Sequence, residues 1–334
     1  MTVRYHLWTP SLRSAHLERL QPLPGIDLRL LASGTHPDCD PVLLADPPVP
    51  VTVAALPALA ASLAADPPDV LEVTEPRWRA HWSRALTLAS AAPGARLVTY
   101  AIDNLPPVAA EATVGLERLA AVAFGSADAQ LAYAAAYPSW RPFGAMLPER
   151  RASCHRCYPA GASVVNAQRE VVLAAELGPR KGVDVLLAAW PAVAVRAAGW
   201  RLRLLGWGPL VGAARTFAGA RDDVEVAPLT DRAGIHAALR RAAVVVLPSR
   251  RVEGWREQVG LSLVEGPAHG CRVVTTTETG IAAELAAAGH EVVAPDDVAA
   301  LTAGLLRAVR AAGPTKLLPV GEDSRMAATR WLAG

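Results

Sequence analysis

The chain has 334 residues, of which 52% are hydrophobic and 19% charged, and its formal net charge is +2 at pH 7. This composition is typical of a folded protein, and the length favours two domains, each with its own core. The near-neutral charge, without a block of basic residues, argues against non-specific binding of nucleic acid, which needs clustered positive charge.

The first half of the chain alternates short β-branched runs with Ala- and Leu-rich stretches, a pattern typical of βαβ units with a parallel sheet. We expect strands at residues 3–8, 27–32, 69–74, 96–101 and 121–124. We expect helices at residues 77–91 and 127–136. Residues 51–65 are apolar, but the segment is short and is broken by Pro57.

The second half repeats the scheme more clearly. Strands are expected at residues 170–175, 201–205, 224–227, 243–247, 272–276 and 291–294. Helices are expected at residues 183–197, 209–218, 231–242, 261–269 and 298–311. The pattern predicts two Rossmann-like, doubly wound α/β domains that face each other across a cleft, where ligands of such sheets bind.

These elements divide the chain into a first domain at residues 1–150, a linker at 151–168 and a second domain at 169–312. The tail at residues 313–334 begins with prolines and resumes a helical pattern, so we expect it to cross back to the first domain. The N-terminal segment lacks the apolar core of a secretory signal, and no stretch has the ~18–20 apolar residues that span a bilayer. We therefore expect a cytoplasmic protein without a transmembrane segment.

The segment at residues 257–265 carries two glutamates around a helix start and follows a buried strand that ends in Leu-Pro-Ser. Gly260 lets the backbone approach a ligand at this helix start, where amide groups favour an anion. Glu265 has apolar neighbours, so its carboxylate needs partners, and sugar hydroxyls can supply them. Alternatively, Glu257 and Glu265 are solvated or pair with local arginines such as Arg256.

Two further segments also point to an anionic ligand. Arg180 and Lys181 precede the start of an amphipathic helix, where two cations suit a diphosphate. The alternative is an ordinary basic surface turn. Gly206 begins a Gly-Trp-Gly-Pro turn after the next strand, a weak signal by itself because such turns end many strands.

Taken together, these segments resemble the C-terminal half of the family-4 retaining glycosyltransferases of GT-B fold. The resemblance covers about residues 169–300. The matching motifs are Lys-Gly-Val-Asp at 181–184, Gly-Trp-Gly-Pro at 206–209, Leu-Pro-Ser at 247–249, the two glutamates at 257 and 265, and Gly-Cys-Arg-Val-Val at 270–274. Thr279-Gly280 followed by Glu284 resembles the loop that contacts the donor in that family.

The resemblance implies that Glu265 holds the nucleotide ribose, that Glu257 is catalytic and faces the donor sugar, and that Lys181 contacts the diphosphate. The donor-binding set implied in this way is Lys181, Arg180, Gly206, Leu229, Gly260, Leu261 and Glu265, with Leu229 near the base. Such enzymes retain the anomeric configuration and need no metal or cofactor, because basic side chains and helix amides stabilise the departing diphosphate.

The sequence departs from this family at several positions. Glu176 stands where relatives carry an arginine, so either Arg180 substitutes for it or the donor site is weakened. Thr74 stands where relatives present a histidine to the donor sugar, and it is our second catalytic candidate because it can hydrogen-bond. Pro267 predicts a kink after Glu265.

The acceptor site has no motif of its own, so its candidates come from the expected strand ends of the first domain, with plain turns as the alternative. They are Thr9, Glu75, Asp103, Asn104 and Ser126.

The cysteines suggest a metal site only weakly. Cys154 and Cys157 have the spacing of a zinc or redox pair, and His36 and Cys39 could supply two more ligands. Nothing in the sequence brings the two segments together, so we expect no metal. Cys271 begins a buried strand and is expected to lie in the core.

The sequence thus predicts an enzyme that moves a sugar from a UDP-, GDP- or dTDP-sugar to a small-molecule or glycan acceptor, as in secondary metabolism. One alternative is a catalytically weakened GT-B pseudoenzyme or partner subunit, which Glu176 and Thr74 favour. Another is an enzyme such as an epimerase, which acts on a nucleotide sugar without transfer. The base, the sugar, the acceptor and the oligomeric state stay open.

Overall fold

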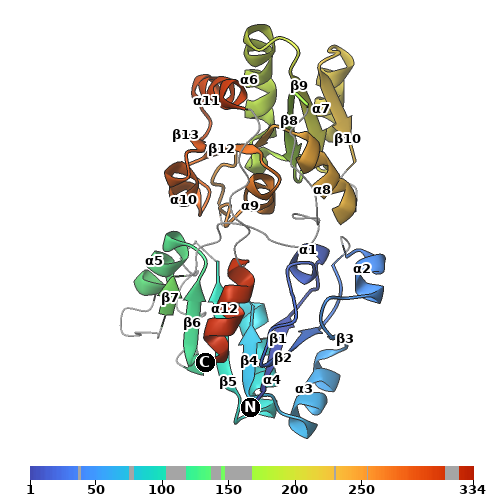
Figure 1. Ribbon diagram of the computed structural model, residues 1–334, viewed down its shortest axis with the longest axis vertical. Helices are drawn as coiled ribbons and strands as arrows, with labels where there is room; N and C mark the ends of the chain where they lie inside the picture. Colours follow the sequence, from blue (N-terminus) through green and yellow to red (C-terminus); the bar gives the residue numbers. More distant parts are fainter. Residues whose placement is uncertain are drawn as a thin grey trace. The chain divides into compact units, whose positions relative to one another are not determined.

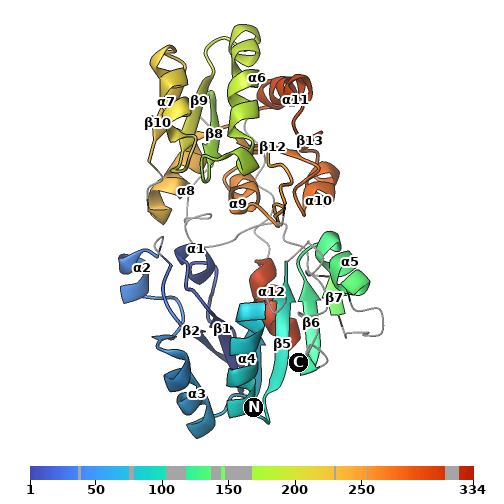
Figure 2. The same cartoon turned by 180° about the vertical axis from the view of Figure 1, so that it is seen from behind.

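The computed structural model describes residues 1–36, 39–74, 79–102, 118–136, 144–146, 168–228, 231–253, 255–312 and 323–334. The chain forms two compact units, Met1–Glu149 with Glu322–Gly334 and Arg150–Gly321. Each unit contains one sheet with helices on both faces (Figures 1 and 2). The predicted α/β class is confirmed in both.

The first unit is built on a seven-stranded parallel sheet in the order β3-β2-β1-β4-β5-β6-β7. Its strands are β1 (Val3–Thr9), β2 (Ile26–Ala32), β3 (Val51–Val53), β4 (Val70–Val73), β5 (Arg96–Ala101), β6 (Ala121–Phe124) and β7 (Gly144–Met146). β3 and β7 were not predicted from the sequence. Both are three-residue edge strands, too short for a run of apolar residues to mark them.

Helices cover both faces of this sheet. They are α1 (Ser14–Leu17), α2 (Pro41–Ala45), α3 (Leu56–Ala65), α4 (Arg79–Ala91), α5 (Ala127–Ala136) and α12 (Ser324–Ala333). Trp8 and Leu71 pack with α3 and α4 on one face, whereas Tyr5 and Leu28 pack with α1 and α12 on the other. The segment expected to be broken by Pro57 forms α3, because a proline in the first helical turn lacks only an N–H that would have no partner there.

The C-terminal helix α12 belongs to the first unit, where it packs on β5 and β6. A buried ion pair holds its start: Arg19 donates from Nε and Nη2 to Asp323, at 3.0 and 2.8 Å. Two residues further on, Arg325 donates from Nη1 to Glu72 Oε1 at 2.6 Å. Polar contacts therefore fix this helix as well as apolar packing.

The second unit contains a six-stranded parallel sheet in the order β10-β9-β8-β11-β12-β13. Its strands are β8 (Glu170–Ala174), β9 (Arg201–Leu205), β10 (Val224–Ala227), β11 (Val244–Leu247), β12 (Arg272–Thr276) and β13 (Glu291–Val293). Its helices are α6 (Val183–Arg196), α7 (Val211–Gly219), α8 (Arg232–Arg241), α9 (Leu261–Ala268), α10 (Ala282–Ala287) and α11 (Val298–Ala311). Only the short α10 was not predicted.

The buried strands of this unit are apolar on both sides because helices cover both faces. Val244 and Val246 pack toward α6 and α11, whereas Val245 points to α9. A Cβ on Gly266 would lie 2.5 Å from Val245 Cγ1, so the glycine allows α9 to approach β11 closely. Within the described part of the chain, no helix is long and apolar enough to cross a bilayer.

Candidate functional site

The strand order of the second unit reverses between β8 and β11. Loops that leave the carboxyl ends of two such strands run in opposite directions, and the crevice between them is where open α/β sheets bind ligands. The β8 loop carries Glu176, Arg180 and Lys181, and the β11 loop carries Ser249 and Glu257. The topology therefore brings together two segments singled out from the sequence.

Gly182 allows these two loops to approach each other closely. It has a φ of +67°, and a Cβ there would lie only 2.0 Å from the carbonyl oxygen of Pro248. The backbone N–H of Arg250 also donates to the carbonyl of Arg180 at 3.1 Å. The short 3-10 helix Pro179–Lys181 is consequently held against the end of β11.

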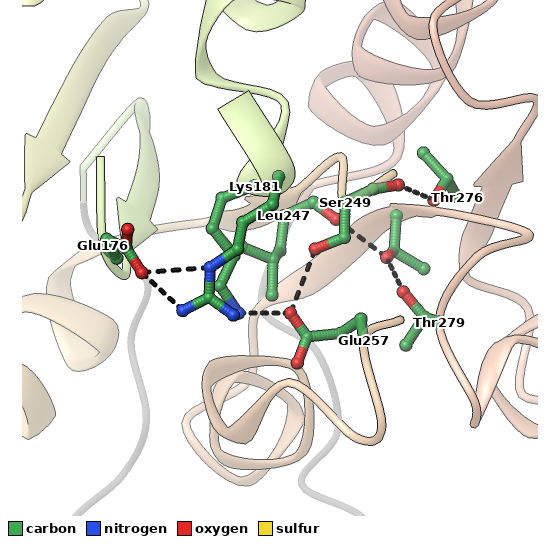
Figure 3. Close-up of polar contacts among 9 residues, drawn as sticks. Glu176, Lys181, Leu247, Ser249, Glu257, Thr276 and Thr279 are labelled. Carbon is green, nitrogen blue, oxygen red and sulfur yellow. Dashed lines mark hydrogen bonds and ion pairs between the residues drawn. The ribbon is translucent and has the colours of Figure 1, made fainter. Parts of the chain in front are cut away.

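Lys181 and Glu257 form an ion pair at this point (Figure 3). The hydroxyl of Ser249 donates to the same carboxylate oxygen at 3.0 Å. The Lys181 and Glu257 side chains are 12% and 8% exposed, respectively, so the pair is largely withdrawn from water. Glu257 is also fixed through its backbone, because the N–H of Gly280 donates to its carbonyl at 2.9 Å.

Three threonine hydroxyls hold the neighbouring strand ends in place (Figure 3). Thr275 lies 2.8 Å from both the Leu247 carbonyl and the Thr279 hydroxyl, and Thr276 donates to the carbonyl of Ser249. These buried hydroxyls are paired, as burial requires. They fix the backbone that presents Ser249 and Glu257.

A second charged pair lies beside the first. Arg180 donates from Nε to Glu176 Oε2 at 3.0 Å, and its Nη2 contacts the same oxygen. The Trp255 ring lies against both cations, with its centroid 4.4 Å from Arg180 Cζ and 4.8 Å from Lys181 Nζ. Two carboxylates and one aromatic ring therefore surround the two basic side chains.

Glu265 is buried in α9 and forms an ion pair with Arg232 of α8. Arg232 Nη2 also lies 3.1 Å from His236 Nε2, and His236 Nδ1 lies 2.8 Å from His269 Nε2. The carboxylate of Glu265 was expected to need a partner, and that partner is the guanidinium of Arg232, 33 residues away in the chain. The helix continues past Glu265 through Pro267 to Ala268.

Of the remaining donor-site candidates, two are glycines in close backbone packing. Gly260 precedes α9 with a φ of +72°, and Leu261 is the first residue of that helix. A Cβ on Gly206 would lie 2.1 Å from the carbonyl oxygen of Ala175, so this glycine brings the β9 loop against the β8 loop. Leu229 lies outside the described residues.

The acceptor candidates belong to the first unit, whose own strand order reverses between β1 and β4. Thr9 ends β1 and Thr74 follows β4, with Thr74 N–H donating to the Trp8 carbonyl at 3.2 Å. Ser126 is fully buried, and its hydroxyl accepts from Ala129 N–H at 3.1 Å at the start of α5. Glu75, Asp103 and Asn104 lie outside the described residues.

Two of the four cysteines lie within the described residues. Cys154 and Cys157 lie outside the described residues, and Cys39 is partly buried. Cys271 is buried, as predicted, with Sγ 3.1 Å from the Leu239 carbonyl oxygen.

Trp255, Ser249 and Arg232 were missed as site residues. Ser249 could have been found, because it follows a buried strand at the carboxyl end of the sheet. Trp255 lies in an arginine-rich loop without periodicity, and Arg232 is paired with Glu265 only by the fold, so neither carried a sequence signal.

Two Rossmann-like units in one chain, with the charged site at the reversal point of the second, define a protein of GT-B fold. Residues 168–311 match the family model described as glycosyl transferases group 1. This segment therefore resembles the group 1 glycosyltransferases, and the predicted resemblance to glycosyltransferases of GT-B fold is confirmed. None of the curated protein sequences compared with the chain matches it.

Solved structures of glycosyltransferases have the same fold. A glycosyltransferase from Rickettsia africae is 13% identical, with a TM-score of 0.69 over 99% of this chain and 93% of that one. HepE from Anabaena, in complex with UDP and glucose, is 16% identical, with a TM-score of 0.67 over 98% and 95%. AviGT4, a glycosyltransferase involved in avilamycin A biosynthesis, is 18% identical, with a TM-score of 0.63 over 99% and 95%.

Proposed function

We propose that the chain is a retaining, metal-independent glycosyltransferase that moves a sugar from a nucleotide-diphosphate donor to a small-molecule or glycan acceptor. The observation that carries the proposal is the pairing of Lys181 with Glu257 where the strand order reverses. A cation and a carboxylate on adjoining loops suit a ligand that joins a diphosphate to a sugar. The diphosphate needs a positive partner, whereas the sugar hydroxyls can donate hydrogen bonds to a carboxylate.

The second unit binds the donor in this proposal. Lys181 and Arg180 bind the diphosphate, and the first amide groups of α9, after Gly260, add partial positive charge. Glu265, oriented by Arg232, accepts hydrogen bonds from the ribose hydroxyls. The complex of HepE with UDP and glucose supports this type of ligand.

The reaction breaks the bond between the anomeric carbon and the donor phosphate oxygen. A bond to the acceptor oxygen forms on the same face of the sugar, and the acceptor proton passes to the leaving phosphate. Lys181 and Arg180 stabilise the negative charge that develops on the diphosphate. Glu257 orients the donor sugar by accepting hydrogen bonds from its hydroxyl groups.

The first unit binds the acceptor, with Thr9 at its own reversal point and Thr74, the second catalytic candidate, at the end of the neighbouring strand. We propose a secondary metabolite or small glycan as the acceptor. The departure of this unit from the family motifs motivates this choice, and the pathway of AviGT4 is consistent with it. A screen that finds turnover only with lipids or long polysaccharides would contradict it.

The proposal is tested by thermal shift with UDP, GDP and dTDP, followed by turnover with the matching nucleotide sugar. At least one nucleotide should stabilise the protein. Glu257→Gln should bind that nucleotide at least as tightly as the wild type but lower turnover about 100-fold or more, the scale for one electrostatic contact to the transition state. Wild-type turnover by a folded Glu257→Gln variant would refute the assignment of this residue.

A second candidate is a catalytically weakened GT-B pseudoenzyme or partner subunit that binds nucleotide poorly. The observation that favours it is the ion pair of Glu176 with Arg180, which reduces the positive charge available to a diphosphate. This candidate would be supported if UDP, GDP and dTDP all failed to stabilise the protein in the thermal shift and no nucleotide sugar gave a product.

A further inference from the structure

We propose that Trp255 is a positioning residue for the diphosphate subsite, and that Glu176 competes with the diphosphate for Arg180. The ring of Trp255 would hold the guanidinium of Arg180 and the ammonium of Lys181 beside each other while an anion binds them. This inference rests on the proposed function, because it names the residues that prepare the same donor site.

The two cations share one aromatic ring. Its centroid lies 4.4 Å from Arg180 Cζ and 4.8 Å from Lys181 Nζ, within the range of a favourable cation–π interaction. Neighbouring basic side chains repel each other. An incoming anion would also weaken the ion pairs that Arg180 and Lys181 form with Glu176 and Glu257. A neutral ring that attracts both cations offsets this repulsion without adding a negative charge that would oppose the ligand.

The geometry of the guanidinium separates the two kinds of partner. An aromatic ring interacts with its flat face, whereas phosphate and carboxylate oxygens bind the N–H groups along its edges. Glu176 already occupies the edge formed by Nε and Nη2 of Arg180. Trp255 and a diphosphate can therefore bind Arg180 together, whereas Glu176 occupies one edge, and part of the charge, that a diphosphate would otherwise use.

The backbone holds Trp255 in place for this task. Trp255 N–H donates to the Val252 carbonyl at 3.1 Å, and Val252 N–H donates to the Trp255 carbonyl at 3.0 Å. Two residues further on, the Gly280 N–H donates to the Glu257 carbonyl at 2.9 Å. Hydrogen bonds thus anchor the segment that carries Trp255 on both sides of the ring.

The two ion pairs differ in exposure. The side chains of Arg180 and Glu176 are 35% and 22% exposed, against 12% and 8% for Lys181 and Glu257. A more exposed pair is more strongly screened and is easier to separate. We therefore assign Glu176 as the carboxylate that yields first when a diphosphate enters.

Binding measurements on four variants test the inference. The probes are inorganic pyrophosphate, the nucleoside diphosphate that binds the wild-type protein, and its nucleoside. Trp255→Leu should weaken pyrophosphate and the nucleoside diphosphate by about 5- to 30-fold, the scale of a lost cation–π interaction, and leave the nucleoside within about 2-fold. Trp255→Phe should lie between this variant and the wild type. Trp331→Leu, in α12 of the first unit, is the control.

Glu176→Gln provides the complementary test, since it should tighten pyrophosphate by several-fold. The inference is wrong if Trp255→Leu leaves the diphosphates unaffected, if it weakens the nucleoside equally, or if Glu176→Gln does not tighten pyrophosphate. Should Trp255→Leu not fold, Trp255→Phe and Glu176→Gln still decide. A wild-type protein that binds none of the probes would instead overturn the proposed function itself.

Discussion

Arg325 and Glu72 form a two-pronged ion pair within the first unit, although 253 residues separate them in the sequence. The Glu72 side chain is fully buried, and it also accepts a hydrogen bond from the Tyr5 hydroxyl at 2.6 Å. A carboxylate inside a sheet that is otherwise apolar is tolerated only with such partners. Arg325 therefore completes the core that Glu72 would otherwise destabilise.

Replacing Arg325 with methionine should lower the free energy of unfolding by about 3–5 kcal/mol, because it leaves a buried charge without its counter-ion. Arg4→Met is the control, since Arg4 pairs with Asp66 at the surface and should cost at most about 1 kcal/mol. Urea unfolding, followed by circular dichroism, measures both. Equal costs for the two variants would contradict the role of Arg325.

The ion pair of Arg232 with Glu265 should behave in the same way in the second unit. Arg232→Met should destabilise the protein by about 3–5 kcal/mol, and Arg232→Met combined with Glu265→Leu should recover much of this loss. A double-mutant cycle on the urea midpoints measures the coupling. Purely additive effects would show that the two side chains do not stabilise each other.

Gly182→Ala should destabilise the protein by more than about 2 kcal/mol, because a left-handed backbone alone costs about 1–2 kcal/mol in a residue with a side chain. The added Cβ would also clash with a backbone carbonyl, 2.0 Å away, that cannot turn aside. Gly212→Ala, in α7 with open space around it, should be neutral or stabilising. Melting temperatures compare the two variants, and similar values would refute the close packing at Gly182.

The second unit should become less stable as the pH is lowered below neutrality. Burial, reinforced by the charge of Arg272, lowers the pKa of His290 from 6.5 to about 4. Between these values the unfolded chain binds a proton at His290 that the folded chain does not, so acidification favours unfolding through this window. The loss should reach about 2–3 kcal/mol at pH 4.

His290→Asn removes this titration. From pH 7 to pH 4 the wild type should lose about 2–3 kcal/mol of unfolding free energy relative to the variant. Urea titrations at both pH values measure it, and other groups that titrate there affect both proteins alike. A constant difference would show that His290 does not contribute.

Most of the fold could be predicted because the central strands are apolar on both faces and are separated by helices of regular periodicity. β11, with its run of valines, is an example. The misses were short elements such as β3 and β7, whose three residues show no period. α3 was missed because Pro57 was taken as a break, although it lies in the first turn.

Candidate donor-site residues could be named where a motif of fixed spacing exists, as for Lys181, Glu257 and Glu265. Their partners could not be predicted, because Arg232 and Trp255 come from other segments and meet them only when the sheet has formed. Local sequence can indicate that a buried carboxylate needs a cation. Which cation supplies the charge is decided by tertiary packing.

Because α12 belongs to the first unit, that unit can be completed only after the second unit has been synthesised. The ribosome makes residues 323–334 after every strand of the second unit, so a nascent first unit has Glu72 but neither Arg325 nor the helix that packs on β5 and β6. The second unit, in contrast, is continuous in the sequence. The unit that begins synthesis first is therefore completed last.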